Sequence, residues 1–229
     1  ETLASQKMAK TDLINRYHHW WNAGAFDTGP TFAMVFQKVS QGLSPKQASI
    51  QVHKDLKGAT AGCGPAHRIA PIAGYTKIPT DRLFSIAIEE AAITHYHKDA
   101  GNCSAIMALL CRYLIEGNSW KESKEIVSQN EDLKSTWIKI ESASLNNGGF
   151  VLDVMHSAFH FLDNKNSLLD KLIISISAPT KSISDGKISK KLISVFRISS
   201  IDSDSLIIHS YTVFFISFFD IPNPEVVFA

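Results

Sequence analysis

The sequence predicts an all-α protein, a multi-helix bundle followed by a C-terminal segment of different character. Three observations support this prediction. Ser44-Pro45-Lys46-Gln47 and Ser119-Trp120-Lys121-Glu122 each place a serine three residues before a Gln or Glu, which is the capping box that begins helices. Hydrophobic residues in the segment 151–162 recur at helical spacing and form one apolar stripe. Before residue 177 the loops are short and no convincing strand is found.

Capping residues, first-turn prolines and terminal glycines set the bounds of the individual helices. Thr11-Asp12 and Thr80-Asp81 are examples of expected caps. In chain order, we expect helices over residues 11–21, 31–41, 45–56, 65–75, 80–94, 100–116, 120–129, 132–143, 151–162 and 168–176. The segment 100–116 is apolar or small nearly all round, which predicts a helix buried on most sides.

The composition narrows the classes of function. Lys and Arg number 23 and Asp and Glu number 22, so the formal net charge of the 229 residues is +1. No broad attraction to nucleic acid or to a membrane surface is therefore expected. Cys63, Cys103 and Cys111 lie in apolar segments that are predicted to be helical, and we expect them to be reduced in an intracellular, cytoplasmic protein. The chain begins at Glu1 within a sequence typical of a helix, so we expect it to be a fragment of a longer protein.

The glycine-rich segment AGCGPAHRIAPIAGY is the most distinctive part of the chain. Gly62 and Gly64 are expected to take positive φ and to let a ligand approach the backbone closely. Pro65 is expected to open a helix. The free N–H groups of that helix, those of Ala66 and His67, would favour an anion. The alternative reading is an ordinary helix start packed in a core.

Several stretches, taken in order, resemble one known family. GCGPAHRIAPI, the helical segment ending in ITHYH, and the small-residue helix GNCSAIMALLCRYLIEG together resemble the ADP-ribosylglycohydrolases. NRYHHWWNAGAFDTGPTF upstream and NNGGFVLDVMHSAFHFLD downstream are also similar to that family. The resemblance spans residues 1–176 and implies the all-helical ADP-ribosylglycohydrolase fold. It also implies the family reaction, hydrolysis of the bond between ADP-ribose and an acceptor, usually with two Mg²⁺ ions.

The resemblance further implies a pocket for ADP-ribose, formed by Asp27, Gly62, Cys63, Gly64, Pro65, Arg68 and His95. The turn 62–64 would approach the diphosphate and the adjacent ribose, and Arg68 would buttress it. His95, in the family's Thr-His pair, would contact the ligand, and Asp27 lies in the matched Phe-Asp-x-Gly loop at the same rim. Cys63 stands where the family usually has Asn, which calls one hydrogen-bond pair to the ligand into question.

The metal centre of the family is not recognised in this sequence. The resemblance places its first motif, Thr-Asp-Asp, just before Glu1. Its second motif, Asp-x-Asp-Thr, would fall near Ile176–Thr180, a stretch without a carboxylate. Because a hard divalent cation needs oxygen ligands at fixed positions, we expect no bound Mg²⁺ and no catalysis by these residues. ADP-ribose would then be bound weakly. The alternative function is a non-catalytic helical binding or scaffold protein that has kept only the fold.

Two other groups of polar residues have the residue types of a metal site. His95, His97 and Asp99 alternate along a predicted helix boundary, where their side chains would diverge. The second group shares one helical face and consists of Asp153, His156, His160 and Asp163. We interpret it as the polar face opposite the apolar stripe, since no glutamate follows the first histidine as in a metalloprotease motif.

Beyond Ser177 the composition changes abruptly. The sequence becomes rich in Ser, Ile and Phe. It has segments of high β-propensity at 192–198 and 206–219 and no pattern of helix-capping residues. The run 211–219 is too short to span a membrane. We therefore divide the chain into a helical domain, 1–176, and a poorly specified tail, 177–229.

Overall fold

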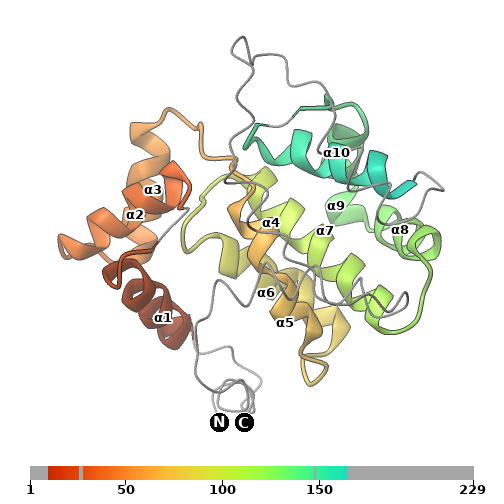
Figure 1. The fold of residues 1–229 in the computed structure, drawn as a ribbon, viewed down its shortest axis with the longest axis horizontal. Helices are drawn as coiled ribbons and strands as arrows, with labels where there is room; N and C mark the ends of the chain where they lie inside the picture. The colour runs from red at the N-terminus through yellow and green to blue at the C-terminus, as the bar shows by residue number, and fades with distance from the viewer. Residues whose placement is uncertain (1–9, 26–27, 147, 164–229) are drawn as a thin grey trace, which may run out of the picture. The chain divides into compact units, whose positions relative to one another are not determined.

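A computed structural model describes residues 10–25, 28–146 and 148–163 of the chain. These residues form α1 (Lys10–Asn22), α2 (Pro30–Ser40), α3 (Pro45–Asp55), α4 (Gly64–Arg68), α5 (Ala70–Gly74), α6 (Thr80–Ala91), α7 (Lys98–Ile115), α8 (Trp120–Ser128), α9 (Glu131–Glu141) and α10 (Val151–Asp163) (Figure 1). The all-α prediction is confirmed for this part of the chain. The predicted helix 168–176 and the tail 177–229 lie outside the described residues.

Both capping boxes form as predicted. Before α3, the Ser44 hydroxyl accepts from the N–H of Gln47, and the Gln47 side chain accepts from the N–H of Ser44. Before α8, Ser119 and Glu122 exchange the same two bonds, at 3.3 and 2.8 Å. Each box supplies partners to backbone donors that the first turn of a helix leaves unpaired. The starts of these two helices can therefore be predicted from the local sequence.

Two helix predictions differ from the structure, one in the continuity of a helix and one in its capping residue. The single helix predicted over 65–75 is two short helices, α4 and α5, with Ile69 between them. Pro71 explains the break, because proline has no N–H to donate to the carbonyl four residues earlier, so the hydrogen bonds of α4 cannot continue into α5. Thr80 opens α6 but does not cap it. Its hydroxyl instead donates to Glu116 (3.0 Å) and accepts from Arg112 (3.2 Å), tying the start of α6 to α7.

The long helix α7 is the centre of the larger of the two hydrophobic cores found among the described residues. It contacts α4, α5, α6, α8, α9 and α10. Twelve of its residues, Asp99–Ile106, Ala108–Leu110 and Arg112, are buried, as expected from its apolar and small side chains. At Gly101 a Cβ would lie 3.2 Å from Ile88 Cδ1, so the missing side chain lets α6 and α7 approach closely. This contact sets the position of α6, which carries the buried polar residues described below.

The smaller core belongs to α1, α2 and α3. Phe32 and Phe36 of α2 stack at a centroid distance of 4.5 Å, and Tyr17 of α1 meets both rings edge-on. Val52 of α3 and Ile93, which follows α6, complete the buried set together with Val35 and Ala48. Tyr17 and Ile93 therefore connect the first three helices to the part of the chain around α6.

Arg112 of α7 is a buried cation whose hydrogen-bond partners, among the described residues, are backbone carbonyls and one hydroxyl. Its guanidinium donates to three carbonyl oxygens, those of Ala73 (2.8 Å), Tyr75 (2.9 Å) and Ile78 (2.7 Å). One side chain thereby satisfies the carbonyls at the end of α5 and in the loop before α6. Such charge-assisted bonds are about twice as strong as neutral ones, so this loop is fixed relative to α7.

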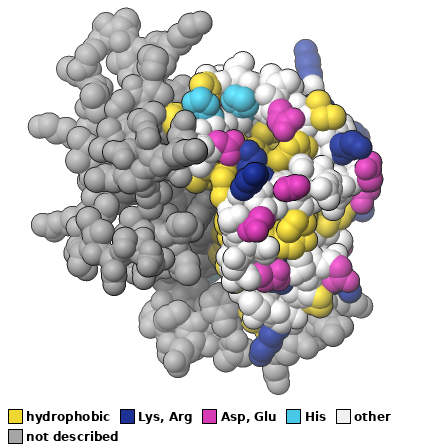
Figure 2. All heavy atoms as spheres, turned by 90° about the vertical axis from the view of Figure 1, so that its right-hand side faces the viewer, with side chains coloured by type: hydrophobic (Ala, Val, Ile, Leu, Met, Phe, Trp, Pro, Cys, Tyr) yellow, Lys and Arg dark blue, Asp and Glu magenta, His cyan; other side chains and the backbone are white. Residues whose placement is uncertain are grey.

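The charged residues on the face shown in Figure 2 are not segregated by sign. Lys and Arg side chains alternate there with Asp and Glu, and apolar side chains lie between them. This agrees with the near-zero net charge, because interspersed charges produce no large field of one sign. In the described part of the chain, none of the helices combines the length and hydropathy that crossing a membrane would require.

Candidate functional site

The Gly-Cys-Gly turn is joined to the turn that precedes α10. The N–H of Cys63 donates to the carbonyl of Gly149 (3.0 Å), and the N–H of Val151 donates to the carbonyl of Ala61 (2.9 Å). Together these bonds form an isolated antiparallel bridge. Two glycine-rich stretches that are far apart in the sequence thus form one surface. The turn residues 62–64 are half-buried on it.

The two glycines of this turn serve a different purpose from the one predicted. Neither Gly62 nor Gly64 has positive φ, so that part of the prediction is wrong. Their lack of a side chain makes room for a histidine ring. A Cβ on Gly62 would lie 2.9 Å from Nε2 of His95, and one on Gly64 would lie 3.4 Å from Cε1 of the same ring. The ring of His95 therefore approaches the backbone of this turn closely, and the approach of a ligand to the same turn stays a prediction.

The helix start behind the turn offers fewer free donors than expected. The N–H of His67 donates to the carbonyl of Cys63 (3.1 Å) and is not free, contrary to the prediction. Cys63 already has helical φ and ψ, which closes this bond. α4 has only five residues, and the side chain of His67 is exposed. The helix end alone is thus a weak basis for an anion site.

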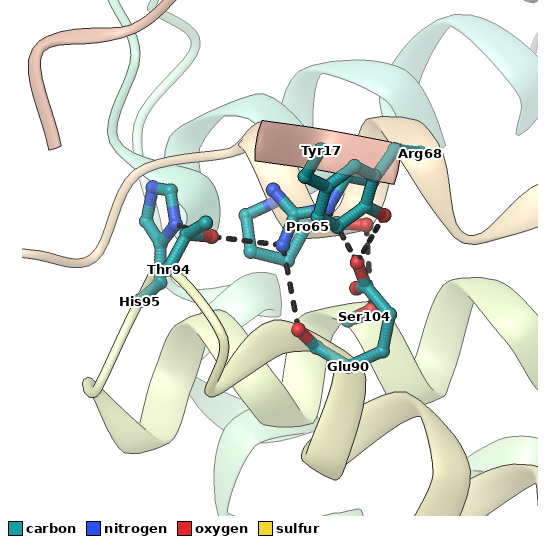
Figure 3. Close-up of polar contacts among 7 residues, drawn as sticks. All are labelled: Tyr17, Pro65, Arg68, Glu90, Thr94, His95 and Ser104. Carbon is teal, nitrogen blue, oxygen red and sulfur yellow. Dashed lines mark hydrogen bonds and ion pairs between the residues drawn. The ribbon is translucent and has the colours of Figure 1, made fainter. Parts of the chain in front are cut away.

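Arg68 lies behind the turn in a buried polar network (Figure 3). Its Nε donates to Oε1 of Glu90 (2.5 Å), and one of its terminal nitrogens, Nη2, donates to the hydroxyl of Thr94 (2.8 Å). The hydroxyl of Tyr17 donates to the same oxygen of Glu90 (2.6 Å), and the guanidinium carbon lies 5.3 Å from the centre of the Tyr17 ring. The network therefore joins α1, α4 and α6.

The network carries one ion pair at a depth where unpaired charge is costly. Glu90 has no exposed surface and Arg68 is 8% exposed. Burial lowers the pKa of Arg68, but the charges of Glu90 and Tyr17 and their hydrogen bonds together outweigh this effect and leave the pKa above its usual value. Burial and then Glu90 hold the pKa of Tyr17 well above its usual value, so its hydroxyl remains a donor. The second carboxylate oxygen, Oε2 of Glu90, is buried and has no hydrogen-bond partner among the residues that the structure describes.

His95 is held as a neutral side chain between this network and the turn. It is 5% exposed, and its Nδ1 lies 2.7 Å from the hydroxyl of Thr94. Burial, followed by the positive charge of Arg68, lowers the pKa of His95 to about 3, so the imidazole is uncharged at neutral pH. Figure 3 shows one ring nitrogen turned toward Thr94 and the other directed away from the network.

The second nitrogen of His95 is available at the surface of the turn. Nε2 makes no hydrogen bond within the described part of the chain. In the described residues, two side-chain polar atoms are fully buried without a partner, Oε2 of Glu90 and Oγ of Ser123, and Nε2 is not one of them. Nε2 therefore reaches solvent beside Gly62, although the rest of the ring is covered. A polar atom in this position can bond a ligand that lies over the turn.

The remaining predicted pocket residues divide into three cases. Pro65 is buried, and its carbonyl accepts from Ser104 of α7 (3.3 Å), so it anchors the turn from behind. Cys63 is half-buried, and burial raises the pKa of its thiol, which keeps it protonated at neutral pH. Asp27 lies outside the described residues. All three cysteines, Cys63, Cys103 and Cys111, are free.

The comparison with protein families decides the classification. The family model for ADP-ribosylglycohydrolase matches residues 1–178, well over half of the chain. The chain belongs to the ADP-ribosylglycohydrolase family. At the level of the family, this membership implies hydrolase chemistry and ADP-ribosylated substrates. No curated protein and no solved structure matches the chain.

The polar groups with the residue types of a metal site have partners within the protein. Nδ1 of His97 accepts from the N–H of Asp99 and caps α7, while Nζ of Lys139 lies 2.9 Å from the Asp99 carboxylate. Nδ1 of His156 bonds the carbonyl of Ile140 (2.8 Å). Among the residues that the structure describes, no group of three or more His, Cys, Asp and Glu side chains is arranged to hold a metal ion.

Glu90 was missed by sequence reasoning, although the sequence carries a signal for it. The apolar stripe of α6 repeats at Leu83, Ile86, Ala87 and Ala91, and Glu90 occupies the next position of the same stripe. A carboxylate on a buried stripe requires a buried cationic partner, and in this member of the ADP-ribosylglycohydrolase family the partner is Arg68. Tyr17 carries no comparable signal, because an aromatic residue on an apolar face is ordinary.

Replacing Gly62 with Ala tests the packing of His95 against the turn. The added Cβ would meet Nε2 at 2.9 Å, and the ring cannot yield freely because its other side is bonded to Thr94. We expect Gly62→Ala to lower the free energy of unfolding by about 1–3 kcal/mol, as overpacking does. Urea denaturation measures this. Gly149→Ala in the adjoining turn is the matched control, since its Cβ would meet nothing within 4 Å. Equal stability of the two variants would contradict this packing.

Proposed function

We propose that the chain binds the ADP-ribosyl group at the turn 62–64, with His95 as a direct contact. The observation that carries this proposal is Nε2 of His95, a neutral polar nitrogen at the surface of the turn without a hydrogen bond in the described part of the chain. It lies within the part of the chain that matches a family of ADP-ribosyl hydrolases. The half-buried backbone beside it leaves a ligand access to both.

The affinity is weak on this proposal. The N–H of Cys63 is engaged by Gly149 and that of His67 by Cys63, which removes two backbone donors that a diphosphate could use. His95 is neutral and adds no charge attraction. Arg68 is positively charged, but its guanidinium is bonded to Glu90 and Thr94 on the far side of the turn.

We further propose that these 229 residues bind the ligand without hydrolysing its glycosidic bond. Hydrolysis in the family depends on metal ions held by carboxylates, and the stretch Ile176–Thr180, where the resemblance places one ligand motif, contains none. The two aspartates of α10 are already bonded within the protein. Asp153 accepts from Ser144 and Asn146, and Asp163 accepts from Trp120 and Lys124. The carboxylates that the structure describes in α10 therefore do not fit a two-metal centre.

A scaffold protein without ligand is the second candidate. The burial of Pro65 and of nearly all of His95 supports it, because those side chains already serve internal packing. On this reading the glycine turn is kept for the fit of the histidine ring alone. The two candidates differ in one property, the recognition of a diphosphate-linked ribose.

Isothermal titration calorimetry of the full chain with ADP-ribose and with adenosine distinguishes the two candidates. We expect ADP-ribose to bind weakly and adenosine to bind more weakly still, because adenosine lacks the diphosphate and the second ribose that would lie over the turn. The dissociation constant should be the same with Mg²⁺ and with a chelator, and no product should form. Equal binding of the two ligands, or no binding by folded protein, would favour the scaffold. Turnover that requires Mg²⁺ would overturn the non-catalytic part of the proposal.

Replacing Cys63 with Asn should strengthen binding. Family members usually have Asn at this position, and the backbone at Cys63, with φ −78° and ψ −7°, accepts Asn without strain. One added neutral hydrogen bond is worth about 0.5–1.5 kcal/mol, so we expect the affinity for ADP-ribose to rise by about twofold to tenfold. Cys63→Ala is the matched control and should give no gain. If Cys63→Asn folds normally and binds no more tightly than Cys63→Ala, the ligand does not contact this turn.

A further inference from the structure

The hydroxyl of Thr94 has its hydrogen-bond roles assigned by its neighbours. Nη2 of Arg68 lies 2.8 Å from it and can only donate, so the Thr94 oxygen accepts there. Thr94 has no exposed surface, and an unpaired hydroxyl proton at such a site would be costly. Within the described residues, its other hydrogen-bond partner is Nδ1 of His95, at 2.7 Å. The hydroxyl proton is therefore directed to Nδ1.

The assignment of Nδ1 as acceptor determines which nitrogen of His95 carries the proton. A neutral imidazole has one N–H, and it cannot lie on the nitrogen that accepts a hydrogen bond. The proton is then on Nε2, the nitrogen beside Gly62 that reaches solvent. Glu90 keeps this order in place, because it pairs with Nε of Arg68 and holds the guanidinium in a fixed orientation toward Thr94.

We propose that Thr94 is a positioning residue for ligand recognition. Through its bonds to Arg68 and His95 it fixes His95 as the Nε2–H tautomer and presents that N–H, beside the glycine turn, to an oxygen of the ADP-ribosyl ligand. This inference rests on the proposed function for the identity of the ligand. The tautomer itself is a property of the free protein. A donor in this place favours ligands with acceptor oxygens, such as phosphate or ribose hydroxyl oxygens, over ligands that offer only N–H groups.

Nitrogen-15 NMR of the imidazole groups, together with calorimetry, tests this proposal. The full chain contains nine histidines, and a spectrum of His95→Gln identifies the His95 signals. In the wild type we expect Nδ1 to show the shift of an unprotonated ring nitrogen and Nε2 that of an N–H. Thr94→Ser keeps the hydroxyl, whereas Thr94→Val keeps the shape without it. Thr94→Ser should therefore retain the tautomer and bind ADP-ribose within about twofold of the wild type, whereas Thr94→Val should lose the fixed tautomer and bind ADP-ribose more weakly.

The expected loss in Thr94→Val is about threefold to tenfold in affinity, equivalent to one hydrogen bond. Circular dichroism and thermal melting establish that both variants are folded, and the wild-type tautomer is informative even if Thr94→Val is not. A His95 proton on Nδ1 in protein that binds ADP-ribose would overturn this inference and leave the proposed function standing. So would a Thr94→Val variant that keeps the wild-type tautomer and affinity. Wild-type protein that has the Nε2–H tautomer but does not bind ADP-ribose would overturn the proposed function and the role in recognition that depends on it.

Discussion

The buried ion pair between Arg68 and Glu90 is the contact on which the rest of this structure depends. Removing one member of such a pair leaves the other charge unpaired in the interior, at a cost of about 3–5 kcal/mol. Here each partner also holds a second element in place. Glu90 accepts from Tyr17 of α1, and Arg68 donates to Thr94, which follows α6. Few substitutions at either position would leave the surrounding helices where they are.

The same contact links the fold to the candidate site. Arg68 orients Thr94, Thr94 bonds His95, and the ring of His95 occupies the space left by Gly62 and Gly64. Each step depends on the one before it, so the surface of the turn is determined by residues buried behind it.

Sequence reasoning succeeded where the determining interactions are local. The capping boxes at Ser44 and Ser119 are complete within four residues, and both form as expected. The break at Ile69 was missed, because the helical periodicity continues through it and only Pro71 interrupts the backbone bonds. The glycines illustrate a different limit. A glycine can provide positive φ or close approach, and the sequence does not say which, since the deciding partner of Gly62 is His95, 33 positions away.

The structure tests how the candidate site is built, whereas the ligand-binding role of its residues stays a prediction. The resemblance selected Gly62, Gly64, Arg68 and His95, and the structure brings these four together. It could not indicate Tyr17 or Glu90, which come from two other helices and act through contacts that only the folded chain creates. The loss of backbone donors at Cys63 and His67 was likewise invisible, because each depends on a single hydrogen bond.

A crystal structure of the chain with bound ADP-ribose is the most direct test of the central claim, that the buried network presents His95 to a ligand at the glycine turn. The account predicts the diphosphate or an adjacent ribose over residues 62–64. It also predicts a ligand oxygen at hydrogen-bond distance, about 2.7–3.2 Å, from Nε2 of His95, with the bond between Nδ1 and Thr94 unchanged. ADP-ribose bound elsewhere on the protein, or a His95 ring that has left Thr94 in the complex, would contradict it.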